Sequence, residues 1–230
     1  MDGVSIITCT HVPFYKTNIF ENYSRQHYKT KELILILNSL SLNSDEWQFY
    51  AKSYDNVRIF VKPDYITVGA CMNFAVSQAN YNYIANFDHD DYYGAEYIND
   101  YMSVAPRLSA GLFGKKTHYV YFEDSWTLAI MHPGHENMFV DYVDGPTMFM
   151  KKEIFDKVSY IDSNISDCQL SWACTERGIG IYSVNKRHFA YIRKPNTELH
   201  TWKIDNQELL NNYCSVVTHI QQYRPYVDYR

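Results

Sequence analysis

Short apolar runs alternate with helix-like spacings through the first half of the chain. Runs rich in Val, Ile and Leu at 4–9, 33–37, 57–61 and 83–87 predict buried strands. Between and after them, one-sided apolar spacing predicts helices at about 14–23, 43–54, 68–79 and 95–105. Strand–helix–strand units with short links are typical of right-handed crossovers. The pattern therefore predicts an α/β fold with a mainly parallel central sheet.

The second half is less regular. Strand-like runs occur at 112–113, 118–122, 126–131, 147–150, 182–184 and 190–192. Helical patterns occur at 151–158 and 167–177, and apolar spacing predicts a terminal helix at 205–223. No repeat, low-complexity tract or linker separates the halves. We therefore expect one domain over 1–230, with a ligand-binding half at 1–105 and a smaller mixed half at 106–230.

Polar residues follow the predicted strands of the first half. Thr8 and Thr10 end the first strand, Asn38 follows the second, Asp64 follows the third, and Asp88, Asp90 and Asp91 follow the fourth. Because ligands of such sheets bind at the carboxyl ends of the strands, we expect these side chains to converge on one edge.

Composition excludes several classes of protein. The chain has 230 residues, with 46% hydrophobic and 20% charged residues, so it is not a disordered chain. The formal net charge of −5, without basic clusters, argues against a nucleic-acid partner. No apolar run predicts a transmembrane segment, and the first residues lack the pattern of a secretory signal. Five cysteines without a C-x-x-C pair favour reduced thiols in a cytoplasmic protein.

The segment Asp88-His89-Asp90-Asp91 is the strongest chemical signal. Its carboxylates repel one another unless a cation compensates them. Carboxylate oxygens suit Mg²⁺ or Mn²⁺, which often also bind phosphate oxygens. The alternative is a solvated turn in which one aspartate caps the next helix. Its position after the fourth strand favours the metal site.

Four segments in the right order resemble the family-2 glycosyltransferases, which have the GT-A fold. They are Val4-Ser5-Ile6-Ile7-Thr8-Cys9-Thr10, the stretch 26–36 from Gln26, the helix segment Gly69-Ala70-Cys71-Met72-Asn73, and Asp88-His89-Asp90-Asp91 as the D-x-D-D metal motif. In the second half, 145–155, Ser166-Asp167-Cys168-Gln169-Leu170 and Gly180-Ile181-Tyr182 match more loosely.

The resemblance implies transfer of a sugar from a nucleotide-sugar donor, with inversion, to a hydroxyl of a glycan, polyol or protein. It assigns nucleotide-sugar contacts to Thr8, Thr10, Asn38, Asp64, Asn73, Asp88 and Arg193, metal ligation to Asp88, Asp90 and His200, and acceptor contacts to Asp141, Asp144 and Trp126. Asp91 would orient the acidic turn. Asp167 would be the general base, although a residue that begins a helix can also simply cap it.

The chain departs from the family pattern at several positions. The nucleotide-contacting Asp after the second strand is Asn38, and the Glu before Asp167 is Ser166. An Asn carbonyl still accepts a hydrogen bond from a uracil N–H, so UDP is favoured, with dTDP next. A catalytically inactive carbohydrate-binding or scaffold module is one alternative. A sugar nucleotidyltransferase is another, although the glycine-free segment 10–15 lacks the loop that would hold a triphosphate.

Overall fold

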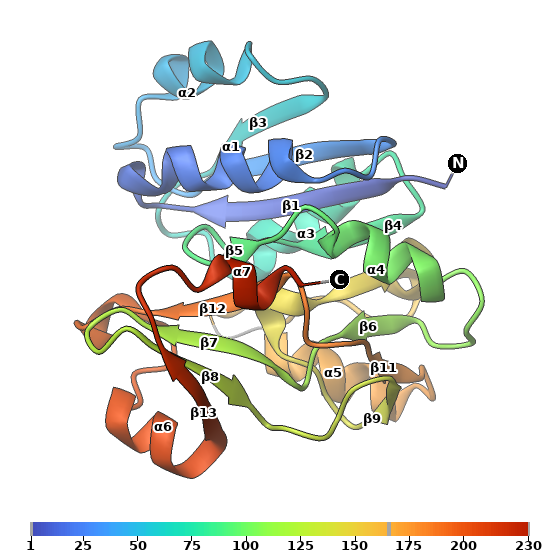
Figure 1. Cartoon of the computed structure of the whole chain (residues 1–230). Coiled ribbons are helices and arrows are strands. Elements are labelled where there is room, and N and C mark those ends of the chain that lie inside the picture. The colour runs from blue at the N-terminus through green and yellow to red at the C-terminus, as the bar shows by residue number, and fades with distance from the viewer. Residues whose placement is uncertain (1, 165–166, 230) are drawn as a thin grey trace.

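The computed structural model describes residues 2–164 and 167–229, with the backbone alone for Asp167 and Cys168 (Figure 1). Its larger sheet has the strand order β3 (Val57–Val61), β2 (Lys31–Leu37), β1 (Val4–Thr10), β4 (Tyr83–Asn86), β10 (Phe149–Lys151), β6 (Leu112–Gly114), β11 (Ile181–Ser183) and β9 (Met138–Val140). The four strands from β3 to β4 are parallel. Their carboxyl ends therefore meet at one edge, as expected.

Helices cover both faces of this sheet. On one face, α1 (Lys16–Arg25), α2 (Ser44–Ala51) and α4 (Tyr97–Val104) contribute to one buried apolar cluster, and on the other, α3 (Val68–Gln78) and α5 (Asp167–Glu176) contribute to a second. The side chains of Asn43 and Thr67 cap α2 and α3. Short 3₁₀ turns lie at Pro13–Tyr15, Gly145–Thr147, Lys152–Asp156 and Thr197–Leu199. No helix of the described part is long and apolar enough to cross a membrane.

A second sheet lies at the lower left in the view of Figure 1, at about the height of β6, β11 and β9 of the larger sheet. Its order is β13 (Cys214–His219), β8 (Thr127–Met131), β7 (His118–Phe122), β12 (Phe189–Arg193) and β5 (Tyr92–Tyr93). The edge strand β5 directly follows the acidic turn, so the first half of the sequence supplies a strand to the second sheet. The short helix α7 (Arg224–Val227) lies close to β5 and β12 (Figure 1).

The predicted terminal helix at 205–223 is wrong. Helix α6 covers Asn206–Tyr213, and the chain then becomes strand β13, which pairs antiparallel with β8. The run Val216-Val217-Thr218 is β-branched, which favours a strand, and the free edge of β8 supplies its hydrogen bonds. Of the apolar residues that indicated a helix, Leu209 is fully buried and Leu210 packs beside it, whereas Val216 and Val217 are exposed on β13.

Candidate functional site

The acidic turn Asp88–Asp91 leads from β4 to β5, at the carboxyl edge of the parallel strands. One carboxylate oxygen each from Asp88, Asp90 and Asp91 lies within 4.8 Å of the other two. Asp88 is exposed, Asp90 is half-buried and Asp91 is buried. The predicted carboxylates therefore gather at one point that ligands can reach.

Aromatic side chains hold the start of the turn. The rings of Phe87 and Tyr93 stack with centroids 3.9 Å apart and planes 6° apart. The backbone N–H of Asp88 donates to the Tyr93 hydroxyl at 2.8 Å, and that hydroxyl donates to the Pro146 carbonyl at 2.7 Å. These contacts place Asp88 against the segment that precedes β10.

Two amides from α1 hold the rest of the turn. Asn18 Nδ2 donates to the carbonyls of His89 and Asp91, both at 2.9 Å. Asn22 Nδ2 donates to the same Asp91 carbonyl at 2.8 Å. Because the backbone of the turn is fixed from α1, its side chains are free to meet at the exposed edge.

Asp91 is the buried member of the cluster. Its Oδ1 accepts a hydrogen bond from the backbone N–H of Ile192 at 2.9 Å, whereas Oδ2 has no hydrogen-bond partner among the described residues. Burial, followed by the charges of Asp90 and Asp88, raises the pKa of the Asp91 carboxyl well above its usual range. A buried oxygen without a partner, beside two other carboxylates, fits a small divalent cation such as Mn²⁺ or Mg²⁺.

His89 packs against the loop that follows β1. Its ring stacks on Tyr15, with centroids 4.6 Å apart and planes 17° apart, and lies edge-on to His11 at 6.3 Å. Burial lowers the pKa of His89 below its usual value. Sequence patterns assign neither His89 nor Tyr15 to the site, because only the fold brings the loop after β1 onto the acidic turn.

Lys194 is a cation close to the acidic turn. Its Nζ pairs with Glu123 Oε1 at 3.0 Å and lies 5.8 Å from the centre of the Tyr15 ring. Its charge also acts on Asp91 and His89. Glu123, at the end of β7, is a neighbour of this site that the sequence reasoning missed.

Arg193 is buried among hydrogen-bond partners outside the acidic turn. The residue is 0% exposed. Its guanidinium donates to the side chains of Asn206 and Tyr191 and to the carbonyls of Trp202 and Ile204. The expected contact with a diphosphate is therefore not supported, because these partners already occupy the guanidinium and tie β12 to the start of α6.

His200 is buried near the same region. Its Nε2 accepts a hydrogen bond from the backbone N–H of Lys194 at 2.9 Å, so this nitrogen is not available to a metal in this arrangement. Burial, then the positive charge of Arg193, lowers the pKa of His200 to about 4, although Asp90 acts in the opposite direction. The imidazole is neutral at neutral pH, and its role as a metal ligand stays a prediction.

The expected nucleoside contacts gather where β1, β2 and β3 end. The backbone N–H of Asn38 donates to the Thr10 carbonyl at 2.8 Å, and Asn38 Nδ2 donates to the carbonyls of Pro63 and Ile66 at 2.9 and 3.1 Å. These bonds use the amide NH₂, which leaves the carbonyl oxygen of Asn38 as the atom for a ligand.

Asp64 and Thr8, two other expected nucleotide contacts, differ in their exposure to solvent. Asp64 is exposed, and its Oδ2 accepts the backbone N–H of Leu40 at 3.1 Å. The Ser39 hydroxyl and that N–H hold the pKa of Asp64 below its usual value, so it is ionised at neutral pH. Thr8 is 1% exposed, and its hydroxyl has no partner among the described residues. Asp64 can therefore meet a ligand, whereas Thr8 lies inside the sheet.

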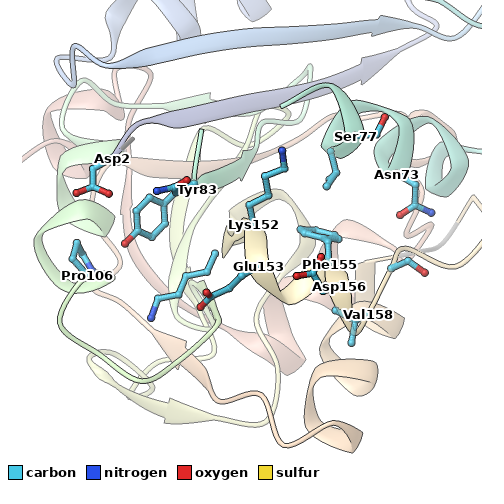
Figure 2. A pocket seen from close by; sticks show the side chains of 14 residues that line it. Asp2, Asn73, Ser77, Tyr83, Pro106, Lys152, Glu153, Phe155, Asp156 and Val158 are labelled. Carbon is cyan, nitrogen blue, oxygen red and sulfur yellow. The ribbon is translucent and has the colours of Figure 1, made fainter. Parts of the chain in front are cut away.

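Asn73 holds the backbone of Tyr160, and its expected nucleotide contact stays a prediction. Its side chain exchanges two hydrogen bonds with the backbone of Tyr160, at 2.8 and 3.0 Å. It also lines an open cavity of about 950 Å³ (Figure 2). Asp2 and Tyr83, beside the starts of β1 and β4, line the same cavity, so it lies at the opposite edge from the acidic turn. The site described here is therefore an open edge of the sheet and not this cavity.

The expected acceptor residues contact other partners. Asp141 is exposed and pairs with Lys116, and Asp144 Oδ2 lies 2.8 Å from His118 Nε2. Trp126 is 52% exposed in the turn between β7 and β8. Asp167 begins α5, as expected, but its side chain lies outside the described residues, as does Ser166. The roles of these residues stay predictions.

Comparisons with known proteins give a result at the level of structure alone. No family model matches the chain, and no curated protein matches it either. Similar solved structures include TarS of S. aureus, residues 1–349, with a TM-score of 0.62 and 12% identity over 83% of this chain and 60% of that one. TarS 1–349 in complex with UDP-GlcNAc gives a TM-score of 0.64 and 12% identity, over 84% of this chain and 59% of that one. The complex of TarS 1–349 with UDP gives a TM-score of 0.60 and 12% identity, over 86% of this chain and 63% of that one.

The chain thus spans about 60% of the length of these TarS structures. At 12% identity the likeness is one of architecture. The mixed α/β arrangement and the mainly parallel large sheet agree with it. The α/β fold of GT-A type that the sequence predicts is confirmed.

Proposed function

We propose that the protein is a metal-dependent inverting glycosyltransferase that moves a sugar from a UDP-sugar to a hydroxyl acceptor. The observation that carries the proposal is the cluster of three carboxylate oxygens within 4.8 Å of one another, at the carboxyl edge of a parallel sheet. The binding of UDP-GlcNAc and UDP by TarS, which has the same fold, supports a nucleotide-sugar donor.

Asp88 and Asp90 would hold Mn²⁺ or Mg²⁺, because they are the accessible members of the cluster. When bound, the ion supplies positive charge that stabilises the departing diphosphate. Asp91 positions the turn through its bond to Ile192. Lys194 replaces Arg193 as the candidate cation for the diphosphate, because its charge faces the acidic turn and Arg193 is buried elsewhere.

Asn38 would recognise the base. Its amide NH₂ is held by two backbone carbonyls, so the amide presents its carbonyl oxygen as the acceptor. An acceptor matches the N–H of uracil, and thymine shares this edge. We therefore propose UDP as the preferred nucleotide, ahead of dTDP and GDP.

Inversion requires a base on the face of the sugar opposite the leaving group. Asp167 is proposed for this role from its position at the start of α5. A carboxylate there would accept the proton of the acceptor hydroxyl as the new glycosidic bond forms.

Calorimetric titration with UDP tests the proposal. With Mn²⁺ present, the wild type should bind UDP more tightly than GDP, and EDTA should abolish binding. Asp90→Asn should lose Mn²⁺-dependent binding with its fold intact, whereas Asp156→Asn, an exposed aspartate of the opposite edge, should bind like the wild type. UDP affinity that EDTA does not change would overturn the metal site.

Hydrolysis of UDP-sugars with Mn²⁺ then separates an enzyme from an inactive binding module. Slow release of UDP without an acceptor supports the transferase. Tight binding with neither hydrolysis nor transfer would contradict catalysis. The anomeric configuration of the product, read by NMR, tests inversion.

A further inference from the structure

The segment that contains α7 packs against β5, the strand that directly follows the acidic turn (Figure 1). Asp228 follows α7, and its Oδ2 accepts a hydrogen bond from the Tyr92 hydroxyl. Its Oδ1 lies 3.1 Å from His188 Nδ1. Tyr92 is the residue after Asp91, so one carboxylate from the C-terminal segment holds both the first residue of β5 and the residue before β12.

The backbone around Asp228 is fitted to the same contact. The backbone N–H of His188 donates to the Val227 carbonyl at 3.0 Å, and Val227 is fully buried. The N–H of Gly94 donates to the His188 carbonyl at 2.8 Å. A Cβ added at Gly94 would lie 2.0 Å from Asp228 Oδ1, so a larger residue at position 94 would displace the carboxylate.

The ring of Tyr92 contacts two guanidinium groups. Its centre lies 4.9 Å from Arg25 Cζ of α1 and 4.8 Å from Arg224 Cζ of α7. Arg25 also donates to the Tyr93 carbonyl at 3.0 Å and to Asn22 Oδ1 at 2.7 Å. Asn22 in turn holds the backbone of the acidic turn. Side chains of α1 and α7, which lie far apart in the sequence, thus meet on β5.

Strand β5 is too short to hold the acidic turn by its own pairing. It has two residues and lies at the edge of the second sheet, where β12 is its partner among the described strands. So short a ladder offers few hydrogen bonds. Because β5 starts directly after Asp91, the side chains that fix β5 from outside the sheet also fix the end of the turn.

We propose that Asp228 is a positioning residue for the acidic turn: by holding Tyr92 and His188 it fixes β5, and β5 keeps the carboxylates in the arrangement that binds a divalent cation and its nucleotide. Without this contact the turn opens more often, and the apparent affinity falls with the fraction of molecules that can bind. The effect on nucleotide binding rests on the proposed function. The effect on the order of the turn rests on the contacts alone.

Amide hydrogen exchange, followed by NMR in EDTA, tests the order of the turn without metal or nucleotide. The N–H groups of Asp88, Tyr93 and Gly94 each donate a hydrogen bond, so they exchange when this region opens locally. Asp228→Ala should speed their exchange at least about tenfold, because the local opening becomes easier. Unchanged exchange at all three amides would overturn the proposal.

Two further variants keep this test decisive. Tyr92→Phe keeps the ring, removes the hydroxyl that donates to Asp228, and should speed the exchange of the same amides to a smaller extent. If Asp228→Ala does not fold, Tyr92→Phe decides the question. Ser5→Ala removes a buried hydroxyl that donates to Glu32 at the opposite edge of the sheet, so the turn should exchange as in the wild type. Equal acceleration in Ser5→Ala would mean that the turn opens only with the whole fold, which contradicts a local role for Asp228.

UDP titration with Mn²⁺ tests the effect on binding. Asp228→Ala should bind UDP at least about tenfold more weakly than the wild type, and Ser5→Ala should bind like the wild type. In the double variant of Tyr92→Phe and Asp228→Ala, the loss should be smaller than the product of the two single losses, because both remove the same hydrogen bond. Urea denaturation first shows that each variant is folded under the conditions of the titration.

Full UDP affinity in Asp228→Ala would refute the positioning role. If the wild type itself binds no UDP with Mn²⁺, the proposed function fails, and the exchange experiment still decides whether Asp228 orders the turn.

Discussion

The Oδ1 atom of Asp91 accepts a hydrogen bond from the backbone N–H of Ile192 at 2.9 Å, across 101 positions of sequence. This bond joins the acidic turn to β12, which pairs parallel with β7 in the second sheet. The carboxylate is buried beside Asp88 and Asp90, so its charge is unfavourable unless a cation is close. Asp91 thus stabilises the fold through its bond to Ile192 and destabilises it through a buried negative charge.

Two substitutions of Asp91 separate these effects. Asp91→Asn keeps an acceptor for Ile192 and removes the buried charge, so in EDTA it should raise the free energy of unfolding by about 1 kcal/mol. Asp91→Ala leaves the Ile192 N–H unpaired and should lower it by about 1–3 kcal/mol. Urea denaturation followed by Trp fluorescence measures both. A less stable Asp91→Asn in EDTA would contradict the charge argument.

The neighbours Arg193 and Lys194 should respond in opposite ways. Arg193→Met removes a buried guanidinium that holds the segment 202–206 and leaves its acceptors without a donor, so the free energy of unfolding should fall by about 1–3 kcal/mol. Lys194→Met should keep its stability and bind UDP about tenfold more weakly. Denaturation and calorimetry give the two quantities. Unchanged UDP affinity in Lys194→Met would contradict the proposed contact between Lys194 and the diphosphate.

Lys115 should make stability depend on pH. It is 0% exposed beside the rings of Tyr97 and Tyr101, and burial lowers its pKa from 10.5 to about 7. Between these values the unfolded chain binds more protons than the native one, so native stability rises with pH. From pH 7 to 9.5 the wild type should gain about 1–3 kcal/mol relative to Lys115→Met, as measured by urea midpoints. A constant difference between the two proteins would mean that Lys115 stays charged.

The stack of Tyr15 on His89 should support the acidic turn. Tyr15→Ala removes the stacked ring and should lower the free energy of unfolding by about 1 kcal/mol, with weaker Mn²⁺-dependent UDP binding. Tyr15→Phe keeps the ring and should behave like the wild type in both measurements. If Tyr15→Phe is as impaired as Tyr15→Ala, the hydroxyl, and not the stack, carries the effect.

Asp167→Asn tests the proposed base. The amide is nearly isosteric and still caps a helix, so stability and UDP affinity should change little. Turnover should fall by about 10²–10⁴, because proton transfer contributes this much to such reactions. Steady-state transfer rates measure the fall in turnover, and calorimetry checks that the UDP affinity is unchanged. Full activity would move the search for the base to Asp144 and Asp141.

The elements of the first half could be predicted because each carries its own signal. The strand at 57–61 matches β3, and the helix predicted at 43–54 matches α2, which Asn43 caps. Parallel neighbours then bring their carboxyl ends together by topology alone, which is why the acidic turn and Asn38 were found at the same edge. Local pattern and global fold agree in this region.

The second half depends on partners that the sequence does not display. Strand β13 pairs with β8, and β5 has only the residues Tyr92–Tyr93, too few for a periodic signal. Arg193 and Lys194 read alike as cations, but Arg193 ends β12 and is buried, whereas Lys194 follows the strand and is partly exposed. Side-chain roles at such positions require the packed structure.

The acidic turn is ordered by residues distant from it in the sequence. Asn22, 69 positions away, and Ile192, 101 positions away, both bond to Asp91. Contacts of such high sequence separation form late in folding, because loop closure precedes any gain from them. During synthesis the ribosome releases β12 long after the carboxylates have emerged. A nascent chain therefore exposes the acidic residues without their final geometry, and the proposed cation site would be complete only after β12 has been made.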